Sequence, residues 1–137
     1  MELVNKMYTV FISGCRKEYS AIDNEAATDS LGEALQGMCP LGFVHAQGVY
    51  KGSKEASFVG HVTTLQDVAA LLNIAKSYEQ EAILVVDNTD SSFLFYTDGA
   101  IEYLGTMYSQ KLMGNELDLG RDSYTIVPSI NRVYYTV

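Results

Sequence analysis

Residues 45–61 read HAQGVY, KGSK and EASFVGH, a pattern that predicts two antiparallel strands joined by a tight turn. A Gly-Ser pair at the tip suits a two-residue type II′ turn in which Gly52 takes the positive φ. In that register Tyr50 lies directly opposite Glu55, and both side chains share one face of the hairpin. The hairpin therefore decides which residues face the core and which face a site.

The two faces of this predicted hairpin differ in character. One face carries Tyr50 and Glu55 together with mostly small or apolar residues, namely Val44, Ala46, Gly48, Ser57, Val59 and His61. The other face is expected to pack on helices and carries Phe43, Val49, Ala56, Phe58 and Val62. A phenol and a carboxylate thus lie on the face that the domain's own helices leave uncovered, which makes them a candidate site.

The composition predicts a single domain over residues 1–137. A hydrophobic content of 47% with two prolines argues against disorder. No apolar run is long enough to cross a bilayer, and the first residues lack the features of a signal peptide, so a cytoplasmic location is expected. A net charge of −8 without Lys/Arg clusters argues against binding to nucleic acid.

The two cysteines, Cys15 and Cys39, have no metal-ligand spacing and are expected to be reduced thiols. The sequence shows no Ser-His-Asp arrangement either. We therefore expect no metal and no cofactor.

Two helices alternate with strands along the chain. A helix over Glu25–Gln36 is expected to begin at a cap on Asp23 or Asn24, and a second helix is expected to run from a Thr64 cap to near Tyr78. Beyond the hairpin, buried or extended strands are predicted at Lys6–Ser13, Ala82–Val86 and Phe93–Thr97.

This β-α-β-β-α-β order predicts an α+β fold, a ferredoxin-like sandwich with extra C-terminal antiparallel strands near Ala100–Met113 and Ser123–Val137. In that plan the helices cover one sheet face only. The other face, with its apolar residues, would be exposed to water, so we expect a second copy of the chain to cover it.

Several stretches resemble the bacteriophage S-adenosylmethionine (SAM) lyases, formerly called SAM hydrolases. The sequence LLNIA at residues 71–75, with YEQE and AILVV over 78–86, is similar to a helix-to-strand passage of that family. YTVFIS at residues 8–13, with Arg16 soon after, resembles the family's first strand. The hairpin is similar too, because a tyrosine follows a glycine on one strand and a glutamate begins the next.

The resemblance implies a small homotrimeric enzyme with sites between subunits. Such an enzyme cleaves SAM to methylthioadenosine and homoserine lactone through attack by the substrate's own carboxylate, and it counters host defence during phage infection. The nucleophile and the leaving group are already tethered, so the protein has mainly to hold a folded conformer. A dry pocket favours the reaction because the sulfonium charge disappears as the C–S bond breaks.

The resemblance assigns catalytic positions to the hairpin pair. Glu55 corresponds to the family's essential glutamate, whose role would be to accept hydrogen bonds from the ribose hydroxyls; the alternative is a solvated residue beside the turn. Tyr50 corresponds to the site tyrosine that would hold the methionine portion near the sulfonium. Its alternative is an ordinary cross-strand aromatic residue.

Substrate-binding roles are assigned to five further residues. Ser13 and Arg16 would contact the methionine carboxylate or, alternatively, cap the first connection, and for Arg16 the capping role is favoured. Asn88 or Thr89 corresponds to a substrate-contacting amide, with a simple turn as the alternative. His61 lies on the site face, although a lone histidine is more often structural. The tyrosines Tyr96, Tyr103, Tyr108, Tyr134 and Tyr135 are expected to pack the added strands and interfaces.

Two questions on function stay open at this point. The hairpin is short, with four residues between Tyr50 and Glu55, which would leave room for a larger substrate such as a SAM–AMP conjugate. The alternatives to a lyase are a non-catalytic oligomeric module that sequesters a SAM-like or nucleotide ligand, and an acidic anti-restriction decoy that mimics DNA. The balance of 17 acidic and 9 basic residues is too small for such a decoy.

Overall fold

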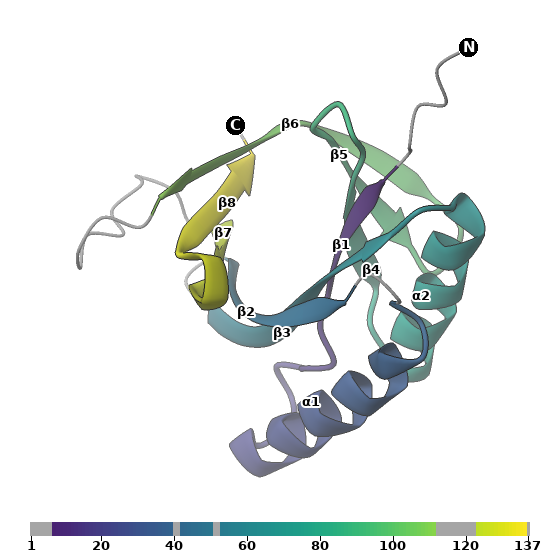
Figure 1. Cartoon of the computed structure of the whole chain (residues 1–137). Helices are drawn as coiled ribbons and strands as arrows, with labels where there is room; N and C mark the ends of the chain where they lie inside the picture. The colour runs from purple at the N-terminus through teal and green to yellow at the C-terminus, as the bar shows by residue number, and fades with distance from the viewer. Residues whose placement is uncertain (1–6, 40–41, 51–52, 112–122, 137) are drawn as a thin grey trace.

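The strands of the chain close into one antiparallel barrel in the order β1-β3-β2-β7-β8-β6-β5-β4, with both helices outside it (Figure 1). The structure is a computed structural model that describes residues 7–39, 42–50, 53–111 and 123–136. Its elements are β1 (Tyr8–Ile12), α1 (Ala21–Gln36), β2 (Phe43–Tyr50), β3 (Ser53–Val62), α2 (Leu65–Ser77), β4 (Ala82–Val86), β5 (Ser91–Tyr96), β6 (Ile101–Lys111), β7 (Ser123–Val127), the 3₁₀ helix η1 (Pro128–Ile130) and β8 (Arg132–Thr136).

The predicted ferredoxin-like sandwich is wrong. The first six elements follow the expected β-α-β-β-α-β order, but the sheet that they form has no open edge. The hairpin strand β2 pairs with β7 on its far side, and β4 pairs with β5, so the later strands continue the sheet until it closes. Closure gives every edge strand a partner, which an open sheet cannot do.

Strand β6 makes this closure possible because its two halves pair with different strands. Its first half pairs with β5, from Ile101 to Thr106, and its second half pairs with β8, from Met107 to Lys111. The bend between the halves coincides with Gly105, whose φ is +99°, and with a register shift at Ser92/Phe93 on β5. Glycine kinks and bulges of this kind are what a sheet needs in order to curve into a barrel.

Helix α1 begins earlier than the sequence predicted. Its N-cap is Ser20, whose hydroxyl accepts a hydrogen bond from the Asp23 N–H at 3.1 Å. Asn24, one of the two predicted caps, instead uses its side-chain amide to bind both backbone polar groups of Arg16, at 2.8 and 3.1 Å. The Thr64 cap of α2 is confirmed, since its hydroxyl accepts from the Asp67 N–H at 3.0 Å.

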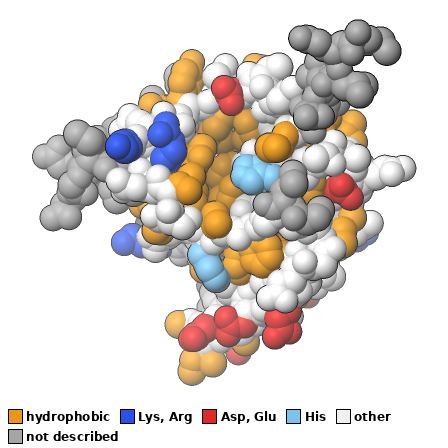
Figure 2. Space-filling view, in the orientation of Figure 1, with side chains coloured by type: hydrophobic (Ala, Val, Ile, Leu, Met, Phe, Trp, Pro, Cys, Tyr) orange, Lys and Arg blue, Asp and Glu red, His pale blue; other side chains and the backbone are white. Residues whose placement is uncertain are grey.

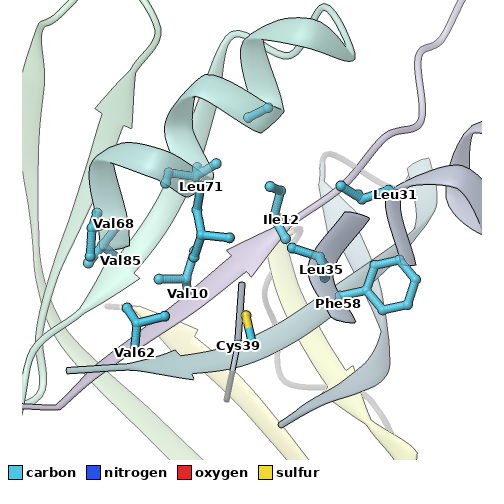
Figure 3. Packing of buried hydrophobic residues seen from close by; sticks show 12 residues of the cluster. Val10, Ile12, Leu31, Leu35, Cys39, Phe58, Val62, Val68, Leu71 and Val85 are labelled. Carbon is cyan, nitrogen blue, oxygen red and sulfur yellow. The ribbon is translucent and has the colours of Figure 1, made fainter. Parts of the chain in front are cut away.

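The larger core lies between the helices and the outer surface of β1, β3 and β4 (Figure 3). Phe58 and Val62 of β3 belong to it, as the predicted hairpin faces required, and both are almost fully buried. Leu31 and Leu35 pack on them from α1, while the residues from α2 are Val68, Leu71 and Ala75. This core fixes β1 and β3, the two strands that carry most of the predicted site.

The hairpin register differs from the predicted one by two residues. Tyr50 pairs with Ser53, and Glu55 lies opposite Gly48. Gly52, on which the predicted type II′ turn depends, lies outside the described residues. Because side chains alternate with a period of two, a two-residue shift leaves every residue on its predicted face.

The hairpin face that the helices leave uncovered is the interior of the barrel. Ala46 and Val59 pack there in a second core with Phe11, Val86, Met107 and Val127. Figure 2 shows hydrophobic side chains gathered in the hollow over the space that the strands enclose. The barrel therefore covers Ala46 and Val59 by itself, so these two residues need no second chain to bury them, whereas Val44 on the same face is 36% exposed.

Candidate functional site

A cavity of about 440 Å³ opens inside the barrel at the end where Glu55 lies. Residues from seven strands line it, namely Gly48, Val49, Glu55, Leu84, Leu94, Tyr96, Glu102, Leu104, Met107, Ser123, Tyr124, Thr125, Tyr134, Tyr135 and Thr136. Leu84, Met107 and Tyr134 also belong to the second core, so that core borders the cavity. Of these described lining residues, the two charged ones are both glutamates. The cavity is thus acidic, rich in tyrosine and partly apolar.

Glu55, the predicted catalytic glutamate, lines this cavity. It lies near the start of β3 on the inward face and is half-buried. Burial raises the pKa of its carboxyl above the ordinary glutamate value, and the positive charge of Lys17 partly opposes this rise. A half-buried carboxylate of this kind is a strong hydrogen-bond acceptor for hydroxyl groups of a ligand.

Tyr96 and Glu102 form a second polar element of the cavity. The Tyr96 hydroxyl, at the end of β5, donates a hydrogen bond of 2.8 Å to Oε1 of Glu102 on β6. In the barrel order, β6 lies four strands from β3 in either direction. Glu102 therefore comes from the wall opposite Glu55.

The tyrosines of the cavity are candidate site residues that the sequence reasoning missed. Tyr96, Tyr134 and Tyr135 were assigned to packing, and Tyr124 was given no role, yet all four line the cavity. Tyr134 also packs edge-to-face on Phe11, with ring centroids 5.7 Å apart. Only barrel closure brings β7 and β8 beside the hairpin, so strand-by-strand pattern reasoning had no signal to find them.

A second cavity of about 640 Å³ lies outside the barrel, between the β1–α1 connection, α1 and the start of β3. Most of its described lining residues are of polar or charged type; the lining consists of Cys15, Arg16, Lys17, Ala21, Asn24, Glu25, Thr28, Asp29, Lys54, Glu55 and Ala56. Glu55 is the described residue that the two cavities share. It therefore stands at the boundary between an aromatic cavity and a charged one.

Arg16 and Ser13 are engaged by the protein itself. The Arg16 guanidinium donates to the Glu18 carboxylate and to the Glu79 backbone carbonyl, and it lies 5.9 Å from the Tyr19 ring centroid. The Ser13 hydroxyl donates to the Ala56 carbonyl oxygen at 2.8 Å and accepts from the Cys15 N–H at 3.0 Å. Arg16 lines the outer cavity, whereas Ser13 fixes the end of β1 to β3 beside Glu55.

The structure does not bring His61 to Glu55. His61 is on the inward face but six residues further along β3, or about 20 Å at the usual strand rise. Its Nδ1 lies 3.2 Å from the Thr9 hydroxyl on the neighbouring strand β1. This contact is what a histidine with a structural role, the alternative to substrate binding, would make.

Asn88 and Thr89 also lie far from Glu55 within one chain. They occupy the β4–β5 turn, which follows Val86 at the His61 end of the barrel. The Asp87 carboxylate organises this turn by accepting from the Thr89 N–H, the Thr89 hydroxyl and the Ser91 N–H at 2.7–3.0 Å. Burial alone would raise the pKa of Asp87, but these hydrogen bonds outweigh it and lower the pKa.

Other predictions concern the cysteines, Tyr50 and metal binding. Cys15 and Cys39 are both buried and free, as expected. The side chain of Tyr50 lies outside the described part of the structure, so its role stays a prediction.

Within the described residues, no group of three or more His, Cys, Asp or Glu side chains is arranged to hold a metal ion. In the same residues, neither helix has the length and apolar character needed to span a membrane.

The closed barrel thus carries an acidic, aromatic cavity at one end, of a size typical of small-molecule sites. The model of the S-Adenosylmethionine lyase family matches residues 10–137 of the chain. The chain belongs to this family, as its sequence resemblance predicted, and is a lyase that acts on SAM. A comparison with curated proteins found no significant match.

Proposed function

We propose that this protein cleaves SAM to methylthioadenosine and homoserine lactone. In the proposed reaction an oxygen of the substrate carboxylate attacks the γ-carbon, and the new C–O bond closes the lactone ring. The C–S bond breaks and its electron pair stays on sulfur, which becomes a neutral thioether. Atoms and charge balance without water, a metal or a cofactor. The protein's main task is to hold the folded conformer in which the carboxylate reaches the carbon.

The observation that carries this proposal is the position of Glu55 in the tyrosine-lined cavity. A volume of about 440 Å³ lies in the range of about 300–1,000 Å³ that is typical of small-molecule sites. Tyrosine rings attract a sulfonium cation through their π faces. The cavity borders the second core on its apolar side, and apolar surroundings favour a transition state in which that cation is being neutralised.

We assign Glu55 the role of binding the ribose hydroxyls rather than that of a proton carrier. The proposed reaction transfers no proton, so a general base has no task in it. A carboxylate that accepts hydrogen bonds from two hydroxyl groups would fix the nucleoside and therefore the direction of attack. Tyr50 remains our candidate for holding the methionine portion near the sulfonium.

The test is to incubate the protein with SAM and separate the products by chromatography. We expect methylthioadenosine and homoserine lactone from the unaltered protein. Glu55→Gln should keep the fold and lower turnover at least about tenfold through loss of a charged contact. The matched control is Glu33→Gln, an exposed position on α1 away from both cavities. Unchanged turnover in Glu55→Gln would show that the assignment is wrong. Binding of SAM without methylthioadenosine would instead favour a sequestering module.

A SAM–AMP conjugate is our candidate for a larger substrate. The outer cavity of about 640 Å³ shares Glu55 with the barrel cavity and carries Lys17 and Lys54, whose charges suit a phosphate. Comparing kcat/KM for SAM and for the conjugate tests this proposal. Equal or better cleavage of free SAM would contradict it.

We further propose a homotrimer in the cytoplasm of a phage-infected host, where loss of SAM would counter host defence. The outer surface of β6 supports assembly, because the large apolar side chains of Ile101 and Tyr103 are each 62% exposed there. Tyr103 packs on Phe93, with ring centroids 5.4 Å apart, and extends this apolar surface onto β5. Light scattering should give three times the 15.1 kDa chain mass. A monomer in solution would contradict the trimer.

A further inference from the structure

We infer that Glu102, oriented by Tyr96, is a binding residue for the α-ammonium group of the substrate. The inference rests on the proposed function and assigns the second carboxylate of the barrel cavity. Glu102 is on β6, directly across the barrel from Glu55 on β3. A ligand that spans the cavity between the two carboxylates can therefore present its nucleoside to one and its amino-acid portion to the other.

The geometry of Glu102 suits an ammonium ligand. The Tyr96 hydroxyl donates to Oε1 at 2.8 Å and so fixes the direction of the carboxylate. In the described part of the chain, Oε2 accepts no hydrogen bond and no cation pairs with the side chain. Glu102 is exposed at the mouth of the cavity, where an entering ligand can reach it. An ammonium group has three donors and forms strong charge-assisted hydrogen bonds to such a carboxylate.

The reaction chemistry distinguishes the ammonium from the sulfonium as the group that Glu102 binds. The sulfonium charge disappears in the transition state, so a carboxylate held against it would stabilise the substrate more than the transition state and slow the reaction. The ammonium charge is present in SAM, in the transition state and in homoserine lactone. A carboxylate can bind it throughout without opposing the chemistry. Glu102 therefore provides uniform binding, which lowers KM and leaves kcat unchanged.

This assignment also predicts what the site selects. The preferred ligand is a cationic nucleoside that carries an α-amino acid. A nucleoside that lacks the amine loses the contact with Glu102, although its adenosine still fits beside Glu55. The two glutamates would then have separable effects, with Glu102 acting on affinity and Glu55 on turnover.

The first experiment measures kcat and KM for Glu102→Gln. We expect KM to rise about fivefold or more, as for loss of a charge-assisted contact, with kcat within about twofold of the unaltered protein. The matched control is Glu81→Gln, which removes the same charge from an exposed position just before β4 and should change neither constant. Tyr96→Phe, which removes the 2.8 Å hydrogen bond but keeps the ring, should raise KM by a smaller factor. A fall in kcat at unchanged KM would overturn the assignment.

The second experiment measures binding by calorimetry, with SAM and with an analogue in which hydrogen replaces the α-ammonium group. The unaltered protein should bind SAM at least about fivefold more tightly than the analogue, whereas Glu102→Gln should bind both alike. Equal affinity of the unaltered protein for the two ligands would overturn the inference even if SAM is cleaved. If SAM binds in this Glu102-dependent way but is not cleaved, the proposed lyase reaction fails and the ammonium site stands.

Discussion

Gly48 on β2 lies directly opposite Glu55 on β3, and both residues line the barrel cavity. A Cβ at position 48 would lie 3.7 Å from the Glu55 carbonyl oxygen and 3.9 Å from the Ser57 hydroxyl oxygen, both ordinary contact distances. The absence of a side chain at Gly48 therefore keeps the cavity open next to Glu55, while the backbone itself would accept a small residue.

A size series at Gly48 should therefore separate folding from binding. We expect Gly48→Ala to keep nearly the same unfolding temperature and to raise KM for SAM only slightly. Gly48→Leu extends further into the cavity beside Glu55 and should raise KM about tenfold or more. Thermal unfolding and steady-state kinetics on the two variants provide the measurement. A Leu variant with the KM of the unaltered protein would place the substrate elsewhere.

The raised pKa of Glu55 predicts how stability depends on pH. Because burial favours the protonated carboxyl, the folded protein keeps this proton to a higher pH than the unfolded chain does. The associated stability is complete below the unfolded glutamate pKa of about 4.3 and is lost as pH rises through the folded pKa. Glu55→Gln cannot ionise, so its unfolding temperature should exceed that of the unaltered protein at pH 7 and match it at acidic pH. A less stable Gln variant at pH 7 would contradict this account.

The lowered pKa of Asp87 predicts the opposite dependence. Its hydrogen-bonded carboxylate contributes stability above the unfolded aspartate pKa of about 3.9, and this contribution is lost as pH falls through the folded pKa. Asp87→Asn should therefore unfold at a lower temperature than the unaltered protein at pH 7, with a smaller difference in acid. Thermal unfolding across pH measures it. A constant difference at all pH values would argue against an ionised Asp87 as the organiser of the β4–β5 turn.

Asn88 tests whether the site is complete within one chain. The structure places it at the far end of the barrel from Glu55, so Asn88→Ala should leave KM for SAM within about twofold. The comparison variant is Gly48→Leu, in which KM should rise. A large rise in KM for Asn88→Ala would mean that a neighbouring subunit supplies this amide to the cavity.

The sequence predicted local features of the fold better than its closure. Periodicity identified Phe58 and Val62 as core residues facing the helices, and the Thr-x-x-Asp pattern identified Thr64 as the cap of α2. The Ser20 cap was missed because Asn24 satisfies the same capping pattern, and its bonds to Arg16 are visible only in three dimensions. The predicted hairpin register was wrong by two residues because it placed Ser53 in the turn, whereas Ser53 belongs to β3 and pairs with Tyr50.

Barrel closure could not be predicted because it depends on pairs far apart in the sequence. Nothing local to Tyr50 indicates that β2 pairs with β7, or that β6 changes partner near Gly105. This is also why the site was predicted only in part. Glu55 stands out from its position and from the family resemblance, whereas Glu102 and Tyr134 enter the site only once the sheet closes.

The central claim is that the substrate's own carboxylate displaces the thioether, and an isotope experiment tests it most directly. The protein is incubated with SAM in ¹⁸O-labelled water, and the products are analysed by mass spectrometry at early times. The account predicts methylthioadenosine together with unlabelled homoserine lactone, because no water enters the reaction. Homoserine that carries ¹⁸O in its hydroxyl group as the first product would show attack by water and would contradict the account.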